Sequence, residues 1–456
     1  MDYKKLMKQY HVDMLDVLKR FILIPSVYDE KTKTKDMPFG KDVNDALTFM
    51  TRLGERYGYD VDRCDGYATE ITIGEGEKLI SIFAHADVVP APGEWKYGPF
   101  NPVVENNNLY GRGTSDDKGP LIAAFYAAKA LYDNSLIKNT RIRFVVGGDE
   151  ERGSSCLHHY FEVLKKEEPT YGFTPDSDFP LIYGEKGITD FHVRKKIVIP
   201  NVKSIKGGVV TNAVCDKVLV EMDKDESFIS YLKDNNVEFE QTENGLIFLG
   251  KAVHGSTPQF GKNAALIALE MLGKYYHVDE LSKIGSELSD TTGKAFDLYS
   301  HSELLGDTTY CVGIISYENN ELYFTVNFRY NENVKPELYK ANFDQHFNVE
   351  STMKEPSNPL LFDPKCDLVS TLLKAYRLET NDMSAPLTSG GGTYAKHAKN
   401  TIAFGALFPN RESTMHEIDE YINLDEFYLS SAIYAHAIKL LIDLWEQNLS
   451  LGQFHI

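Results

Sequence analysis

The chain has 456 residues, about three times the length of a typical domain, so two domains are expected. Its 42% hydrophobic and 25% charged residues exclude a disordered or collagen-like protein. Forty-eight Lys and Arg against 67 Asp and Glu give a net charge of −19. A phosphate backbone or an anionic membrane would repel that charge, so we expect no nucleic acid and no membrane among the partners. We expect most carboxylates to be solvated and a few to hold cations.

The cysteines indicate a reducing compartment, because they are far apart, odd in number and form no C-x-x-C pair. Residues 1–27 mix acids and bases and lack an apolar core, so they do not resemble a signal peptide. No run of about 18 apolar residues predicts a membrane span. The sequence therefore predicts a cytoplasmic protein.

The first segments of the chain alternate between helical and strand patterns. Apolar residues at every fourth position from Leu6 to Ile22 predict one amphipathic helix. Residues 78–84 and 141–146 predict buried strands, and residues 119–132 a helix between them. This alternation predicts the α/β class, with a mixed, largely parallel sheet flanked by helices.

The pattern changes in the middle of the chain. Lysine-rich strand-like segments at 191–199, 245–253 and 321–331 alternate with helices such as 263–276, which indicates an inserted α+β domain. We predict a catalytic domain in two parts, residues 1–192 and 361–456, and an inserted domain at 193–360.

Two helix starts are predicted near the end of the chain. Asp363-Pro364 would open a helix, because proline is tolerated in a first turn. Asn423 and Glu426 have the spacing of a capping box for the last helix.

Candidate cation ligands follow the predicted strands. His85 and Asp87 come directly after the strand at 78–84, and residues i and i+2 of an extended segment point the same way. Alone, such a pair also fits a hydrogen-bonded surface pair. In the glycine-rich segment 111–120, the adjacent acids Asp116 and Asp117 favour a cation site over a phosphate loop.

A third acidic segment follows the strand at 141–146. Asp149, Glu150 and Glu151 would repel one another in a dry cleft unless a cation lay among them. Asp176 and His416 complete the candidate set. Since ligands bind at the carboxyl ends of parallel strands, these side chains are expected to lie together.

The motifs HADVVP, GRGTSDDKGP, GDEERG, FTPDSDFP and STMH occur in the order and spacing of a known family. The chain resembles the two-metal amidohydrolases that include aminoacylase, carboxypeptidase G and carnosinase. GEKGITDF, GKAVHGSTP, NFRYN and SGGGTYAKH bring it nearest to dipeptidases of the peptidase V type. The resemblance covers most of the chain and implies a zinc-peptidase-like catalytic domain with an inserted lid.

The resemblance implies a role for each candidate in the catalytic domain. The metal ligands would be His85 and Asp176 on one ion, Glu151 and His416 on the other, and Asp116 between them. Asp87 would fix the tautomer of His85, and Glu150 would be the general base. Asp117 competes with Asp116 for its role, and Asp178 competes with Asp176. Imidazole and carboxylate ligands suit Zn²⁺ first, with Mn²⁺ or Co²⁺ as alternatives.

The resemblance also implies a substrate pocket in the lid. His254 would stabilise the oxyanion, and Arg329 would bind the carboxylate of a short peptide. Asn212 and the backbone N–H groups of Gly391 and Gly392 would complete the pocket.

The expected function is a metal-dependent dipeptidase, in which a hydroxide bridging the metals attacks the peptide bond of dipeptides or very short peptides. The alternative is an N-acyl-amino-acid deacylase or desuccinylase with the same two-metal site. The partner is a small peptide substrate. A monomer is expected, because the enlarged lid of the peptidase V type supplies from one chain what smaller relatives borrow from a second subunit.

Overall fold

The computed structural model describes residues 1–451 of the chain, and side chains up to residue 444. The chain forms two compact units. Unit 1 comprises Met1–Tyr183, Phe362–Leu387 and the chain from Thr393, whereas unit 2 comprises Gly184–Leu361 and Thr388–Gly392. The domain limits 1–192, 193–360 and 361–456 stay a prediction, which limited proteolysis would test.

Unit 1 is built on a mixed sheet, which confirms the predicted α/β class. Its central strands β6, β3, β7 and β20 are parallel, and the outer strands are antiparallel. In spatial order the strands are β1 (Asp60–Asp62), β2 (Ala68–Ile73), β6 (Thr140–Gly147), β3 (Lys78–His85), β7 (Tyr171–Thr174) and β20 (Thr401–Ala403), followed by β9 (Ile182–Glu185) and β18 (Leu360–Leu361), with β19 (Leu387–Ser389) paired to β9. Of these, β18 and parts of β9 and β19 belong to unit 2.

The two predicted strands of this sheet are confirmed as β3 and β6. Every residue of β3 is buried, as expected for a strand covered on both faces. Two small sheets lie outside the main one. They pair β8 (Ser177–Asp178) with β21 (Ala406–Leu407), and β22 (Tyr421–Asn423) with β5 (Asn108–Tyr110) and β4 (Val103–Glu105).

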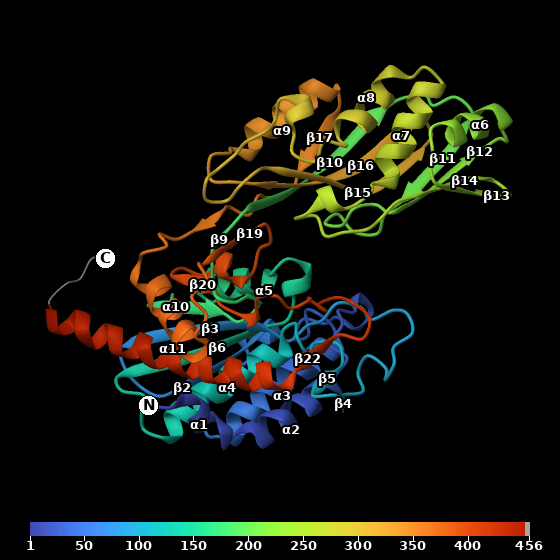
Figure 1. Cartoon of the computed structure of the whole chain (residues 1–456). Helices are drawn as coiled ribbons and strands as arrows, with labels where there is room; N and C mark the ends of the chain where they lie inside the picture. Colours follow the sequence, from blue (N-terminus) through green and yellow to red (C-terminus); the bar gives the residue numbers. More distant parts are fainter. Residues whose placement is uncertain (452–456) are drawn as a thin grey trace. The chain divides into compact units, whose positions relative to one another are not determined.

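The helices of unit 1 include α3 (Lys41–Arg56), α4 (Lys118–Asp133), α5 (Ser155–His158), α10 (Asp367–Thr380) and α11 (Leu424–Leu451). The predicted helix at 119–132 is confirmed as α4, which is buried along most of its length. Figure 1 shows α11 running alongside α4 and α10, and the three helices are in contact. Their apolar side chains belong to the core of unit 1.

The single helix predicted at the N-terminus is wrong. The structure has two helices, α1 (Tyr3–Lys8) and α2 (His11–Ile22). The break falls where the N–H of Tyr10 donates to Met7 O, while Tyr10 O accepts from Met14 N to start α2. Both helices still bury apolar side chains, so the predicted apolar face continues across the break.

The predicted start of α10 is also wrong, whereas the cap of α11 is half confirmed. Asp363 accepts hydrogen bonds from the N–H groups of Lys365 and Cys366, which forms a turn before α10 begins at Asp367. Asn423 does cap α11 through the N–H groups that follow it. Glu426 pairs with Arg411.

One finding runs against the expectation that no segment could span a membrane. By length and composition, Leu424–Leu444 of α11 is sufficiently long and apolar to do so. However, 61% of its most apolar stretch is buried inside the protein, where it packs on α4 and α10. The buried apolar side chains of α11 up to Ile442 therefore form part of the core, as in a central helix of a globular domain.

Unit 2 is an antiparallel sheet with helices on one face (Figure 1). Its strands, in spatial order, are β13 (Phe239–Thr242), β14 (Gly245–Leu249), β12 (Lys217–Met222), β11 (Val202–Gly207), β15 (Thr309–Glu318), β16 (Glu321–Tyr330), β10 (Gly187–Lys196) and β17 (Glu350–Met353). Its helices are α6 (Glu226–Asp234), α7 (Ala264–Tyr275), α8 (Asp279–Glu287) and α9 (Pro336–Phe347).

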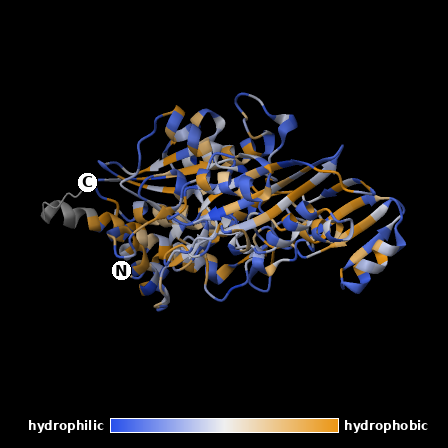
Figure 2. Ribbon diagram, turned by 90° about the horizontal axis from the view of Figure 1, so that it is seen from above, coloured by the Kyte–Doolittle hydropathy of each residue, from blue (hydrophilic) through white to orange (hydrophobic). Residues whose placement is uncertain are grey.

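The long strands of unit 2 have one apolar and one polar face. Figure 2 shows hydrophobic and hydrophilic residues interleaved along them. Phe324, Val326 and Phe328 of β16 enter the core beneath the helices. Because side chains alternate along a strand, Asn327 and Arg329 lie on the opposite face. Both are buried polar residues, which require partners.

Candidate active site

The acidic and imidazole side chains predicted as ligands lie together in unit 1. They follow β3, β6 and β7 and occupy the loops before α4 and β22. The potential ligand atoms of His85, Asp116 and Asp176 all lie within 4.8 Å of one another. Those of Asp116, Glu151 and His416 form a second such group. Asp116 therefore belongs to both groups.

Each oxygen of Asp116 faces a different histidine. Oδ1 lies 2.9 Å from His85 Nε2, and Oδ2 lies 2.9 Å from His416 Nε2. Asp176 Oδ2 lies 3.7 Å from His85 Nε2, and Glu151 Oε1 lies 3.1 Å from His416 Nε2. A carboxylate between two imidazole–carboxylate sets is suited to bridge two divalent cations.

Asp87 contacts His85, Glu150 and Glu151. His85 Nδ1 lies 2.9 Å from the backbone oxygen of Asp87 and 3.5 Å from its carboxylate. The same carboxylate accepts from the N–H groups of Glu150 and Glu151, each at 3.2 Å. Asp87 therefore orients the His85 ring, with Nε2 toward the cluster, and holds the turn that carries both glutamates.

Burial and neighbouring carboxylates raise the proton affinity of Glu150 and Asp176, whereas the hydrogen bonds from His416 and His85 outweigh burial and lower the pKa of Asp116. Burial and the charge of Asp176 raise the pKa of Glu150 well above its usual range, and burial and the charge of Asp116 raise the pKa of Asp176. Burial opposes protonation of His85, but its hydrogen bonds to Asp116 and Asp87 outweigh burial and raise its pKa.

The pKa of His416 is raised in the same way, because its hydrogen bonds to Asp116 and Glu151 outweigh burial. Protons on the two histidines thus compensate negative charge when no cation is bound. Divalent cations would replace these protons, so the donor set fits metal binding.

The competing acids lie outside both groups. Asp117 follows Asp116 through a cis peptide bond. Its Oδ2 accepts from the N–H of His85 at 3.1 Å, whereas its buried Oδ1 has no hydrogen-bond partner among the described residues. Asp178 lies in β8 and belongs to neither group. The geometry thus favours Asp116 and Asp176 as ligands.

Sequence reasoning missed two residues beside the cluster, Glu420 and Arg112. Glu420 is completely buried and accepts hydrogen bonds from the loop that carries Asp116. Arg112 belongs to the motif GRGTSDDKGP, but nothing in the sequence indicates that it pairs with Glu420 at 2.7 Å.

The predicted substrate-binding residues of unit 2 gather around Arg329. Its side chain is 3% exposed. Nε donates to Asn327 Oδ1 at 2.9 Å, and Nη1 donates to Gly390 O at 2.5 Å. Nη2 lies 3.4 Å from Nε2 of His254. Burial lowers the pKa of Arg329 to about 10, although the guanidinium stays charged at neutral pH.

The remaining predicted residues lie in the loops around this cluster. The backbone oxygen of Asn212 accepts from the N–H of Gly255, beside His254. The N–H of Gly391 donates to Ser389 Oγ at 2.9 Å, and Gly392 is exposed. The structure brings His254, Arg329 and the glycine segment together within unit 2.

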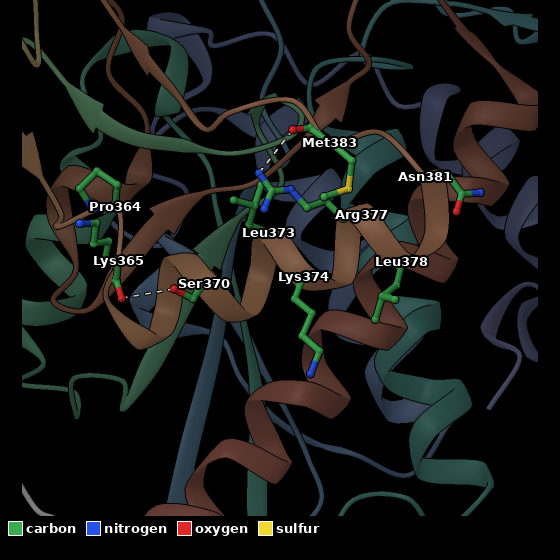
Figure 3. A pocket seen from close by; sticks show the side chains of 9 residues that line it. All are labelled: Pro364, Lys365, Ser370, Leu373, Lys374, Arg377, Leu378, Asn381 and Met383. Carbon is green, nitrogen blue, oxygen red and sulfur yellow. Dashed lines mark hydrogen bonds between the residues drawn. The ribbon is translucent and has the colours of Figure 1, made fainter.

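A separate cavity of about 600 Å³ runs along α10 in unit 1. Figure 3 shows its lining side chains, which come from α10 and its flanking segments and include Lys365, Lys374 and Arg377. None of the predicted site residues lines it. The cavity is therefore separate from the cluster around Asp116.

The family of the chain follows from its similarity to known proteins. The model of peptidase family M20/M25/M40 matches residues 82–440. A "Putative dipeptidase" of Staphylococcus epidermidis is 35% identical, over 96% of this chain and 99% of its own length.

Two solved structures have the same fold at low sequence identity. Human carnosine dipeptidase 1 has a TM-score of 0.60 at 14% identity, covering 97% of this chain and 98% of its own. A dinuclear metal-binding M20 peptidase of Bacillus subtilis has a TM-score of 0.55 at 10% identity, covering 96% and 99%. The extent of the family match and the full-length relative show that this chain belongs to peptidase family M20/M25/M40 and is a metallopeptidase.

Proposed function

We propose that the protein is a dipeptidase that uses two divalent cations to cleave dipeptides or very short peptides. The observation that carries the proposal is the position of Asp116, with one oxygen facing His85 and the other facing His416. The name of the Staphylococcus epidermidis relative supports the substrate class.

His85, Asp116 and Asp176 would hold one ion, and Asp116, Glu151 and His416 would hold the other. Two bound cations lower the pKa of a water between them and polarise the scissile carbonyl. Zn²⁺ suits these ligands best, and Mn²⁺ or Co²⁺ also fit.

Glu150 is proposed as the general base. It neighbours the ligand Glu151 and is half-buried, so water reaches it. Glu150 would take a proton from the attacking water and return it to the leaving amine. Asp87 supports this role by holding the N–H of Glu150.

Unit 2 is proposed to bind the substrate carboxylate and to stabilise the oxyanion. The buried guanidinium of Arg329 would bind the C-terminal carboxylate, and His254 would donate to the developing oxyanion. Asn212 and the N–H groups of Gly391 and Gly392 would add polar contacts. A carboxylate grip places the cleaved bond one residue from the C-terminus, so an enzyme that removes an N-terminal residue with this grip acts on dipeptides.

The proposal is tested by removing the metals with a chelator and restoring Zn²⁺ or Mn²⁺. A dipeptide, its N-acetylated analogue and an octapeptide are then compared. We expect the restored enzyme to cleave the dipeptide and not the other two. Preferential cleavage of the N-acetylated compound would favour the deacylase alternative, and cleavage of the octapeptide alone would contradict a short-peptide enzyme.

We also propose a cytoplasmic monomer. Light scattering during gel filtration should give the 51.6 kDa mass of one chain, and a mass of twice that value would contradict it.

A further inference from the structure

Two loops that carry proposed metal ligands are joined by a buried ion pair. One loop precedes α4 and contains Asp116, and the other precedes β22 and contains His416. Glu420 lies in the second loop and is 0% exposed, and Arg112 lies in the first and is 2% exposed. Arg112 Nη1 and Glu420 Oε2 are 2.7 Å apart.

The carboxylate of Glu420 organises the backbone around Asp116. It accepts hydrogen bonds from the N–H groups of Gly113, Ser115 and Asp116, at 3.1, 2.9 and 3.3 Å. Ser115 Oγ donates to it as well, at 3.0 Å. Several N–H donors on one carboxylate fix the backbone of a short loop, so Glu420 positions the backbone of Asp116.

Arg112 reaches the other ligand. Its Nη2 donates to the backbone oxygen of His416 at 3.2 Å, while Nη1 binds Glu420. His416 has a φ of +64°, a left-handed conformation that a residue other than glycine keeps only when its surroundings hold it. Arg112 supplies such a hold on the backbone of His416.

We propose that Glu420 and Arg112 act as positioning residues, a clasp that sets the distance between Asp116 and His416 and thereby builds the metal group Asp116–Glu151–His416. The inference rests on the proposed two-metal function. It goes beyond that function by predicting an asymmetry, because His416 belongs to this group and not to the group of His85.

The test is calorimetric titration of the metal-free protein with Zn²⁺, for the wild type and for Glu420→Gln. The amide of Gln keeps one acceptor oxygen but turns an N–H₂ toward Arg112. Outer contacts of metal ligands typically change metal affinity about 10–100-fold. Because Asp116 belongs to both groups and His416 to only one, we expect both ions to bind more weakly, with the ion of the Asp116–Glu151–His416 group losing at least about tenfold and the other ion losing less. His416→Ala identifies the more affected ion, because it should weaken the same one.

Glu379→Gln is the matched control. Glu379 is also a buried carboxylate of unit 1, paired with His436 at 2.7 Å between α10 and α11. This variant should lower the melting temperature of the metal-free protein without changing either metal affinity. If Glu379→Gln weakens metal binding as much as Glu420→Gln does, general destabilisation explains the effect and the clasp is refuted.

Arg112→Lys keeps a positive charge beside Glu420 and serves if Glu420→Gln does not fold. A lysine is too short to hold Glu420 and His416 O together, so it should weaken the same ion. Wild-type affinity for both ions in either variant would overturn the clasp while the two-metal function stands. A wild-type protein that binds fewer than two ions would instead refute the proposed function itself.

Discussion

The two clusters of candidate site residues differ in the charge of their central groups. In unit 1, carboxylates outnumber imidazoles, and burial with like-charge repulsion raises the pKa values of Glu150 and Asp176. In unit 2, the buried guanidinium of Arg329 donates to neutral oxygens of Asn327 and Gly390. The first cluster attracts cations, and the second attracts an anion.

This contrast is compatible with the proposed dipeptide substrate. A peptide offers a carbonyl oxygen for bound cations and a terminal carboxylate for a guanidinium, and in a dipeptide these groups lie one residue apart. Each cluster is proposed to bind a different group of the substrate. We therefore predict that a substitution in one cluster changes mainly kcat or mainly KM. The other cluster should still bind its own ligand, the metal ions in unit 1 or the substrate carboxylate in unit 2.

The largest effect is expected for Glu150→Gln. The amide has the shape of the carboxylate but cannot take a proton from water, so kcat on a dipeptide should fall about 10²–10⁴-fold. KM and the number of bound metal ions should stay the same. Glu412→Gln, an exposed residue near His416, is the control and should behave as wild type. Undiminished kcat in Glu150→Gln would remove Glu150 from the mechanism.

Arg329→Met tests the second cluster. Removing the buried guanidinium should lower kcat/KM about 100-fold, mainly through KM, since a charged contact to the substrate is lost. Both metal affinities should be unchanged. Arg194→Met is the matched control, because Arg194 lies on the same face of the same sheet but is exposed. An equal loss in the Arg194 variant would show that Arg329 has no special role.

Removal of the metal ions should lower the thermal stability of unit 1 alone. An ion at 100 times its dissociation constant stabilises the folded state by about 2.7 kcal/mol. For a domain of this size, that corresponds to several degrees in the melting temperature. Scanning calorimetry with and without chelator should therefore shift one transition. A shift of the same size for both units, or none, would contradict the placement of the metals in unit 1.

The smallest effect concerns protons. The carboxylate partners of His85 and His416 raise the pKa values of both imidazoles, which favours their protonated forms in the metal-free protein. Cations must displace those protons, so metal uptake should release protons and metal affinity should rise with pH. Titration in buffers of different ionisation enthalpy counts them. Arg329→Met should release the same number, and affinity that falls with rising pH would contradict the mechanism.

Much of the site was predictable because its parts are local. His85, Glu150 and Glu151 follow strands whose apolar sequences identify them, and short motifs give the spacing of Asp116 and Asp176. Between Asp116 and Asp117, the residues alone left the choice open, and the resemblance to the family favoured Asp116. In the structure Asp116 faces His416, a residue from a distant segment of the chain.

Three other features of the structure were also not predicted from the sequence. Glu420 looks like any surface acid in the sequence, and only its burial against Arg112 distinguishes it. Apolar periodicity continued from Leu6 to Ile22 across a break between two helices. The turn at Asp363 delayed the start of α10, because a side-chain oxygen competed for the backbone N–H groups.

The most direct test of the account compares a dipeptide with its C-terminal amide, using wild type and Arg329→Met. The amide keeps the scissile carbonyl for the metals but lacks the carboxylate proposed to bind Arg329. Wild type should prefer the free dipeptide about 100-fold in kcat/KM, and Arg329→Met should lose that preference. Equal cleavage of both compounds by the wild type would contradict the claim that the two clusters act on one substrate.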